Sequence, residues 1–324
     1  MDRTILALVV VVGVPLATVA YVAVIEWLLK FLSYNARGRL RPWLWLAPAF
    51  LLLAFYLVYP TINTIYLSFM DARSQNFVGL DNFRFAFTNP AMLGAFKNNL
   101  LWLIFFTACT VGFGLIIAVL TDRVRYETAV KALVFLPMAI SAVAAGVIWK
   151  LMYEWDPPGR TQSGTINAVL DTVVPGFEPQ AWLVNTDTNN AALIVIGIWL
   201  WTGFCTIILS AGLKGIPEEL LEAARVDGAN ELQLFRHVTL PLMASTIAVV
   251  ATTMVINVLK VFDIVYVMTN GNYDTEVIAN RMYKEMFNFR DFGRASAIAV
   301  VLLLLIVPVM VYNIRRFREQ EALR

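Results

Sequence analysis

The polar residues with the most informative spacing lie in a charged segment, 214–241, between two long apolar runs. The positions of interest in it are Glu222, Ala223, Ala224, Asp227, Gly228 and Pro241. From Lys214 to Arg236 the segment carries eight charged residues. Glycine permits a sharp turn there, and so hydrophilic a segment cannot lie in hydrocarbon. We therefore predict two short helices joined at Gly228, in water and facing a partner protein.

The rest of the chain offers little for catalysis. Its single histidine, His237, cannot supply a metal cluster, which needs several converging ligands. The two cysteines, Cys109 and Cys205, lie in separate apolar runs and are expected to act as small hydrophobes. No Gly-x-x-x-x-Gly-Lys-Ser/Thr phosphate loop occurs in the sequence. We predict no catalytic residue, no metal site, and no ATP or Mg²⁺ bound by this chain itself.

The composition is that of an integral membrane protein. Hydrophobic residues make up 59% of the 324 positions and charged residues 15%, with a mean hydropathy of +0.69. A net charge of +2 gives no reason to expect nucleic acid. The long runs predict an all-α polytopic protein with about seven transmembrane helices. These runs cover residues 5–25, 43–68, 99–120, 132–152, 191–213, 242–268 and 295–312.

Two of the runs carry more specific expectations. The run 5–25 is too long for the core of a signal peptide, and its start is not basic, so a retained helix is favoured over a cleaved signal. The run 132–152 is rich in small residues, which let helices approach closely, so a helix central in the bundle is expected there.

The basic residues predict the orientation. Of the 25 Lys and Arg, 14 lie in the four segments 30–41, 121–131, 212–241 and 314–324. The positive-inside rule places these segments in the cytoplasm, so the N-terminus lies outside and the C-terminus inside a bacterial cytoplasmic membrane. The expected organisation is an extra N-terminal helix with a basic linker (1–41), a transmembrane domain (42–318) and a short cytoplasmic tail (319–324).

One basic segment, 277–294, falls on the side assigned to the outside. At helical spacing, its residues Ile278, Met282, Met286 and Phe289 line one side. This pattern predicts a helix that lies on the surface or folds back into the outer vestibule.

The 214–241 segment also resembles a known signature. The coupling loop of ABC importer permeases has a characteristic pattern: Glu-Ala-Ala, three residues, Gly, nine residues, a branched aliphatic residue, one residue and Leu-Pro. The sequence matches it at Glu222, Ala223, Ala224, Gly228, Val238, Leu240 and Pro241. Over 42–318 the chain is similar to maltose-type sugar permeases, for example at Phe135-Leu136-Pro137 and over 261–269. Within that group, residues 270–273 and 276–283 resemble permeases of α-glucoside importers.

The resemblance implies a permease that works with several partners. These are two ATP-binding subunits that hold ATP and Mg²⁺, a second homologous permease subunit and an extracytoplasmic solute-binding protein. The substrate would be a sugar, an α-glucoside or another oligosaccharide, moved by alternating access through the lipid membrane. One alternative is another polar solute, such as a polyol, glycerol phosphate or a compatible solute. The other, an ion-coupled secondary transporter, predicts intramembrane carboxylates or interrupted inverted repeats, neither clear in the sequence.

Substrate contacts are sought among aromatic and hydrogen-bonding residues of the later runs. The candidates are Trp199, Trp201, Thr202, Thr253, Asn257, Lys260 and Asp263. Lys260 and Asp263 are three residues apart and are expected on one helix face, at the water-facing outer end of their run. Core packing and hydrogen bonds between helices would explain the other residues equally well.

Overall fold

The structure is a computed structural model that describes residues 3–122, 124–157 and 159–322. The described residues are almost entirely helical and contain no β-strand, only one isolated antiparallel bridge between Met70 and Phe77. This confirms the all-α prediction. The chain divides into two compact units, Met1–Thr64 and Ile65–Arg324. Each unit is described by itself below.

Six helical segments among the described residues are long and apolar enough to cross a membrane, and a bent pair of helices raises the number to seven. The six are Val11–Leu29, Tyr34–Leu67, Pro90–Thr121, Asn189–Lys214, Glu231–Leu259 and Phe292–Arg315. The bent pair is Glu127–Ala139 with Ala142–Met152. The prediction of about seven transmembrane helices agrees with this.

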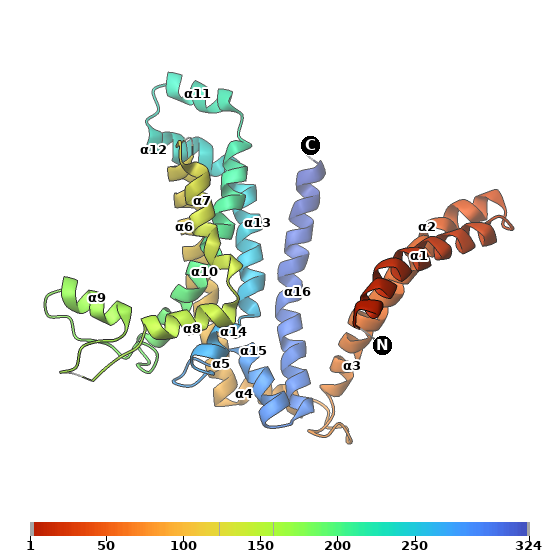
Figure 1. The fold of residues 1–324 in the computed structure, drawn as a ribbon, viewed down its shortest axis with the longest axis horizontal. Helices are drawn as coiled ribbons and strands as arrows, with labels where there is room; N and C mark the ends of the chain where they lie inside the picture. Colours follow the sequence, from red (N-terminus) through yellow and green to blue (C-terminus); the bar gives the residue numbers. More distant parts are fainter. Residues whose placement is uncertain (1–2, 123, 158, 323–324) are drawn as a thin grey trace. The chain divides into compact units, whose positions relative to one another are not determined.

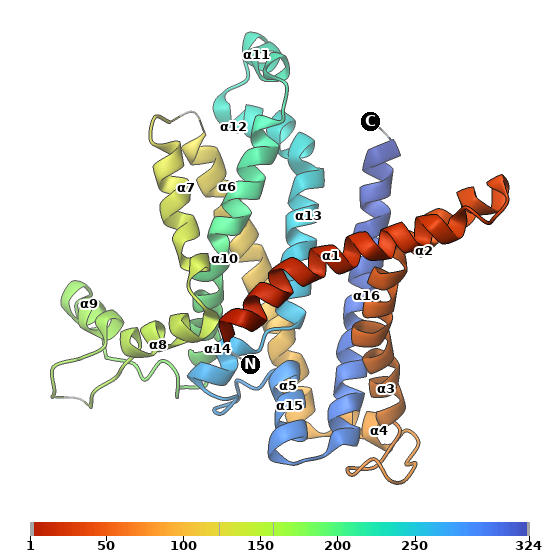
Figure 2. The same ribbon diagram turned by 45° about the vertical axis from the view of Figure 1, so that its right-hand side comes forward.

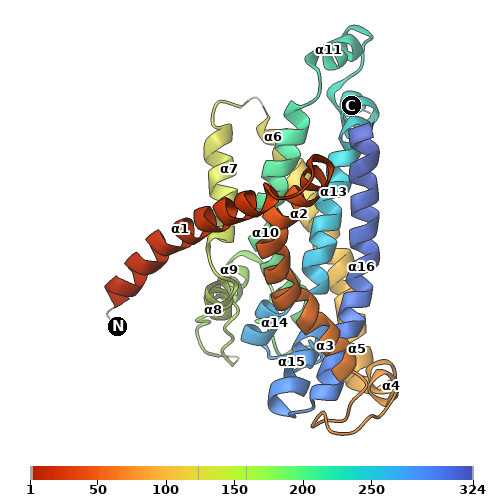
Figure 3. The same ribbon diagram turned by 90° about the vertical axis from the view of Figure 1, so that its right-hand side faces the viewer.

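The first unit is a helical hairpin followed by the start of a third segment. Helix α1 (Arg3–Leu29) and helix α2 (Tyr34–Leu53) are joined by a short turn, visible in Figure 3, and a π-helical turn (Ala54–Val58) leads into α3 (Tyr59–Leu67). The carboxylate of Glu26 in α1 accepts hydrogen bonds from Arg37 at 3.1 Å and Arg41 at 2.7 Å. These ion pairs connect the basic linker to the end of α1, so the hairpin is held by its own charges.

The second unit is built around α10 (Asn189–Lys214). In this helix 61% of an 18-residue apolar stretch is buried, whereas the same measure is 28% to 33% in the other membrane spans of the unit. The backbone at Val134 can approach α10 closely because residue 203 is a glycine. A Cβ added to Gly203 would lie only 2.3 Å from the Val134 carbonyl oxygen. Helices α6 (Thr107–Thr121) and α7 (Glu127–Phe135) pack along α10, and so does α13 (Leu240–Leu259).

The remaining elements of the second unit surround this core. They are α4 (Asp81–Thr88), α5 (Pro90–Leu101), the π-helical turn Trp102–Phe106, a 3-10 turn Leu136–Ala139, α8 (Ala142–Met152), α9 (Thr165–Val173), α11 (Glu218–Val226), α12 (Glu231–Leu234), the π-helical turn Phe235–Thr239, α14 (Asp263–Met268), α15 (Ile278–Tyr283), the π-helical turn Lys284–Asn288 and α16 (Phe292–Ala322).

The fourth apolar run is not the straight central helix that its composition predicts. It bends by 98° between Ala139 and Ala142. Pro137 sits in the 3-10 turn, where it cannot continue an α-helix, and the Ser141 hydroxyl then caps a new helix by accepting from the Ala144 N–H at 3.2 Å. Helix α8 consequently packs mainly against α14 rather than along the central bundle.

The sixth run is also interrupted. Helix α13 ends at Leu259, and the short α14 begins at Asp263. The predicted helix in 277–294 exists as α15 and the π-helical turn after it, and it folds in rather than lying on a surface. Ile278 is 1% exposed, and α15 packs against α16 and α5.

The two ends of the second unit differ in character. Figures 1 and 2 show α11 and α12 at one end of the long helices and α4 and α15 at the other. Helix α10 has 26 residues, which at about 1.5 Å per residue gives roughly 39 Å, enough to span a bilayer. The charged 214–241 segment and the α4–α15 end therefore lie a membrane thickness apart.

Candidate functional site

The charged segment forms the two short helices that its sequence predicts. Glu218 and Glu219 occupy the first turn of α11, where carboxylates favour the positive end of the helix dipole. The helix closes with a Schellman motif. The Ala229 N–H donates to the Ala224 carbonyl at 3.0 Å and the Gly228 N–H to the Arg225 carbonyl at 3.1 Å. This geometry needs the left-handed backbone of Gly228, whose φ is +87°.

Beyond the turn, α12 begins with a capping box formed by Asn230 and Gln233. Arg225 and Glu231 form an ion pair of 3.0 Å across the Gly228 turn. The hydrogen bond to Glu231 raises the pKa of the Arg225 guanidinium above its usual value. Pro241 lies near the start of α13, after a π-helical turn that makes the helix continuous from Glu231. The two helices are therefore held at a set angle by local contacts.

Helix α11 presents its side chains outward, and none of its residues is buried. Glu222, Ala223 and Asp227 are exposed, and Ala224 is half-buried. Exposed apolar residues lie among the charges: Leu220 is 45% exposed, Val226 87% and Leu232 75%. A protruding element that exposes both acidic and apolar residues has the character of a protein-binding surface.

A cluster of charges lies behind this element. The Glu127 carboxylate at the start of α7 accepts from Lys131 and from Lys214, the latter at 2.7 Å, and Lys131 also donates to Ser210. The cluster joins the start of α7 to the end of α10, where the 214–241 segment begins. Its 127–131 pair could be recognised from helical spacing, but the contact with Lys214 depends on packing and was missed.

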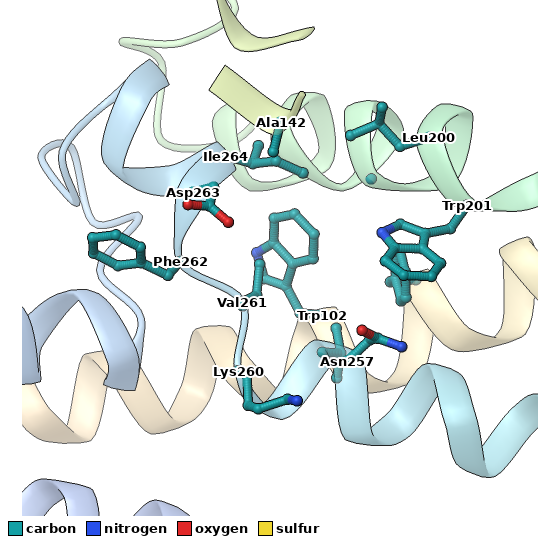
Figure 4. A pocket seen from close by; sticks show the side chains of 13 residues that line it. Trp102, Ala142, Leu200, Trp201, Asn257, Lys260, Val261, Phe262, Asp263 and Ile264 are labelled. Atoms are coloured by element: carbon teal, nitrogen blue, oxygen red, sulfur yellow. The ribbon is translucent and has the colours of Figure 1, made fainter. Parts of the chain in front are cut away.

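The interruption of the sixth run lines a pocket of about 330 Å³, called the break pocket here. Figure 4 shows side chains from four parts of the chain around it, including Ala142 at the start of α8. Residues 257–264 contribute one wall, α10 contributes Trp201 and Leu200, and the helix of α5 and α6 contributes Trp102 and Phe106. The pocket thus combines indole and phenyl faces with an amide and two charges.

The predicted substrate residues divide into two groups. Trp201, Asn257, Lys260 and Asp263 line the break pocket, whereas Trp199, Thr202 and Thr253 do not. The ring of Trp199 packs edge-on against Trp149 in the main core, with centroids 5.7 Å apart.

The two threonines of the second group are occupied within their own helices. Their hydroxyls donate to the carbonyls four residues earlier, Thr202 to Ile198 at 2.6 Å and Thr253 to Val249 at 2.9 Å.

The expectation that Lys260 and Asp263 share one helix face is wrong. Lys260 caps the C-terminus of α13 and Asp263 is the first residue of α14, with non-helical backbone at Phe262 (φ −143°, ψ −60°) between them. Both side chains are exposed, and neither forms an ion pair with another described residue. Two ionisable groups beside a helix break in a membrane protein are typical of a site that water or a solute reaches.

Trp102 is a pocket residue that sequence reasoning missed. It starts the π-helical turn Trp102–Phe106 and is 1% exposed, and its indole N–H has no partner among the described residues. Gly197 makes room for it, because a Cβ there would lie 2.9 Å from the Trp102 ring. In an apolar run a tryptophan looks like any lipid-facing or core residue, so nothing in the sequence distinguished it. π-Helical turns occur often at functional sites.

A family model described as the inner membrane component of binding-protein-dependent transport systems matches residues 110–317. The chain belongs to this family. It is a multi-pass inner membrane permease subunit of an ABC importer, and the resemblance read from the 214–241 segment is confirmed. Permeases of this class work with separate ATPase subunits, so this one is a transport subunit and not the ATPase.

Several proteins are similar to this permease over most of its length. The osmoprotective compounds uptake permease protein GgtC of Synechocystis sp. is 60% identical, over 87% of this chain and all of its own. The α-glucoside transport system permease protein AglF of Rhizobium meliloti is 46% identical over 99% of both chains.

Two solved structures have the same fold. A bacterial ABC transporter involved in import of the acidic polysaccharide alginate aligns with a TM-score of 0.73 and 25% identity, covering 87% of the permease and 99% of that chain. A second alginate transporter structure, which includes a periplasmic protein bound to an alginate pentasaccharide, aligns at 0.72 with 23% identity.

Proposed function

We propose that this permease carries a neutral sugar or glycoside, an α-glucoside in the first place, through the break pocket. The observation that carries the proposal is the lining of that pocket. Trp102 and Trp201 offer indole rings, and Asn257 offers an amide that can donate and accept hydrogen bonds. Sugars present apolar C–H faces and a belt of hydroxyls, which match this combination of aromatic and amide groups. The name of the α-glucoside relative supports this class, whereas the alginate transporter, whose substrate is an acidic polysaccharide, supports only a carbohydrate in general.

The energy would come from partner subunits. We propose that the importer contains two ATP-binding subunits and a second homologous permease, which completes the pathway. The α11 helix of each permease would dock into a groove of one ATP-binding subunit. Glu222 and Asp227 would accept charge-assisted hydrogen bonds, and Ala223 and Ala224 would allow close packing. Gly228 and Pro241 would keep the α11–α12 turn stiff, so that closure of the ATPases around ATP and Mg²⁺ moves α10 and α13. A solute-binding protein outside the cytoplasm would deliver the sugar.

This assignment requires an orientation. The 214–241 segment would face the cytoplasm together with the C-terminus, and the N-terminus would lie outside. Placement of α11 and the α4–α15 end at opposite ends of the second unit supports putting them on opposite sides of the membrane, and the choice of side rests on the distribution of basic residues. The division into residues 1–41, 42–318 and 319–324 stays a prediction, and the last two residues of that tail lie outside the described residues.

A second candidate is a different class of solute. The name of the 60% identical relative favours an osmoprotective compound. The unpaired Lys260 and Asp263 at the pocket would suit a zwitterionic compatible solute, because such a solute brings one charge of each sign. The two candidates therefore predict different roles for the same pair of side chains.

Uptake competition distinguishes the candidates. The importer would be reconstituted in proteoliposomes with its binding protein and ATP on the cytoplasmic side. Uptake of a radiolabelled α-linked disaccharide and, separately, of radiolabelled glycine betaine would be measured. We expect excess α-glucosides to compete and glycine betaine not to compete. Competition by glycine betaine, with loss of uptake in Lys260→Gln and Asp263→Asn, would instead support the zwitterionic solute. Absence of any ATP-dependent uptake of either solute would contradict both.

A further inference from the structure

A second hollow of about 590 Å³, separate from the break pocket, lies between the α5–α6 helix and α10. Its lining changes character along its length. Lys97, Asp187 and Asp274 are among the residues at one end, whereas Leu101, Phe105 and Ile198 line the remainder. The hollow is therefore amphiphilic, with a charged rim and an apolar floor.

The order of these residues follows from the two helices. Lys97, Leu101, Phe105 and Cys109 recur every fourth residue along one helix and all line the hollow. Asn190, Ile194 and Ile198 do the same along α10. From Lys97 to Cys109 the rise is about 18 Å at 1.5 Å per residue, similar to the depth of one leaflet of a hydrocarbon core about 30 Å thick.

The two helices begin at the same end of the unit. Asn98 near the end of α5 donates to the Asp274 carbonyl at 2.6 Å, and Asn190 at the start of α10 approaches the same oxygen at 3.4 Å. The charged rim contributed by both helices is therefore at one level, with the apolar floor extending away from it on both sides.

Asp274 is held at this rim in an unfavourable backbone conformation. Tyr273 and Asp274 have φ values of +56° and +60°, which non-glycine residues rarely adopt. Asn98 and Asn190 hold Asp274, and Asn189 donates to the Tyr273 carbonyl at 2.5 Å. Strained residues that the surroundings hold in place often mark binding sites.

The charges at the rim are not used within the chain. Lys97, Asp187 and Asp274 are exposed, and none of them forms an ion pair with another described residue. One cation and two carboxylates beside an apolar floor match a ligand that carries an anion, a cation and a hydrocarbon chain. A free sugar would leave the floor unused, and an anionic lipid would bring its charge against two carboxylates.

We propose that this hollow binds a membrane phospholipid whose headgroup carries both a phosphate and a primary ammonium. The phosphate pairs with Lys97, the ammonium faces Asp187 and Asp274, and one acyl chain lies along Leu101, Phe105 and Ile198. Phosphatidylethanolamine has this chemistry. With the orientation given under the proposed function, the lipid belongs to the outer leaflet, and its binding does not depend on which solute is carried.

The chain contains its own reporter for this site. Cys109 is half-buried and lines the hollow, whereas Cys205, the other cysteine, is buried in the core. The assembled importer would be placed in nanodiscs of phosphatidylethanolamine or of phosphatidylglycerol with identical acyl chains. The rate of Cys109 labelling by N-ethylmaleimide would be measured by peptide mass spectrometry. We expect labelling to be several-fold slower in phosphatidylethanolamine.

The double variant Lys97→Gln/Asp274→Asn should remove this protection. The control Lys150→Gln/Asp171→Asn changes two exposed charges in α8 and α9 and should retain it. Equal labelling rates in the two lipids would overturn the proposal, because the hollow would then be equally open, or equally covered by another surface such as the second permease, whichever lipid is present. If the double variant does not assemble, the comparison of the two lipids on the unaltered protein still decides. Uptake is not measured, so failure here is distinct from failure of the proposed transport function.

Discussion

The carboxylate of Glu127 lies 2.7 Å from the ammonium of Lys214, although 87 residues separate them in the chain. Glu127 begins α7 and Lys214 ends α10. The contact thus connects a helix of the bent fourth span to the point where the 214–241 segment leaves the membrane. In the proposed coupling, a movement imposed on α11 would reach α10 along the chain, and this ion pair would pass it to α7 as well.

Glu127→Gln tests that connection. The neutral amide cannot balance the charges of Lys131 and Lys214, so the two ammonium groups repel each other and α7 loosens from the end of α10. We expect the number of ATP molecules hydrolysed per solute imported to rise several-fold, with the complex still assembled. The measurement is the ratio of phosphate release to uptake in proteoliposomes. Glu178→Gln, which removes an exposed carboxylate in the 153–188 loop, is the control, and an equal ratio in both variants would refute the connection.

Gly228→Ala tests the turn between α11 and α12. Glycine has φ = +87° there, and an alanine in a left-handed conformation costs about 1–2 kcal/mol. No atom lies within 4 Å of the added Cβ, so the change acts through the backbone alone. We expect an assembled complex in which substrate-loaded binding protein no longer stimulates ATP hydrolysis and uptake falls several-fold.

Gly176→Ala is the matched control for this variant. Gly176 has φ = +78° and also has no neighbour within 4 Å of an added Cβ, so it carries a similar backbone cost in the loop before α10. Its uptake should be close to that of the unaltered protein. Unchanged stimulation in Gly228→Ala would show that the angle between α11 and α12 is not what couples the ATPases to transport.

Trp201→Phe and Trp199→Phe separate the pocket from the core. Trp201 lines the break pocket, so loss of its indole should raise the KM for uptake several-fold and change thermal stability little. Trp199 packs against Trp149, and weakening an aromatic pair costs about 1 kcal/mol, so this variant should unfold at lower temperature with the KM unchanged. Uptake kinetics and thermal unfolding of the purified permease measure the two effects. The reverse result, a raised KM for Trp199→Phe alone, would move the solute path away from the break pocket.

Local sequence determined the membrane spans and the charged segment. A hydrophobic run predicts a span because every backbone polar group in lipid must be satisfied within a helix, whatever surrounds it. The α11–α12 turn was also predictable, because Pro217, Gly228 and the motif residues act through contacts within a few positions of one another.

Tertiary structure alone decided how the pocket and the hollow are formed. The bend after Pro137 and the break after Leu259 both lie inside single predicted runs; Pro137, Lys260 and Asp263 mark their positions in the sequence, but the angle of the bend and the packing around the break depend on tertiary contacts. Trp102 became a pocket residue because Gly197, 95 positions later, leaves space for its ring. Hydropathy and capping are properties of neighbouring residues, whereas a pocket is made by side chains that only packing brings together. That is why Trp201 and Trp199, two residues apart in the same apolar run, came to lie in a pocket and in a core.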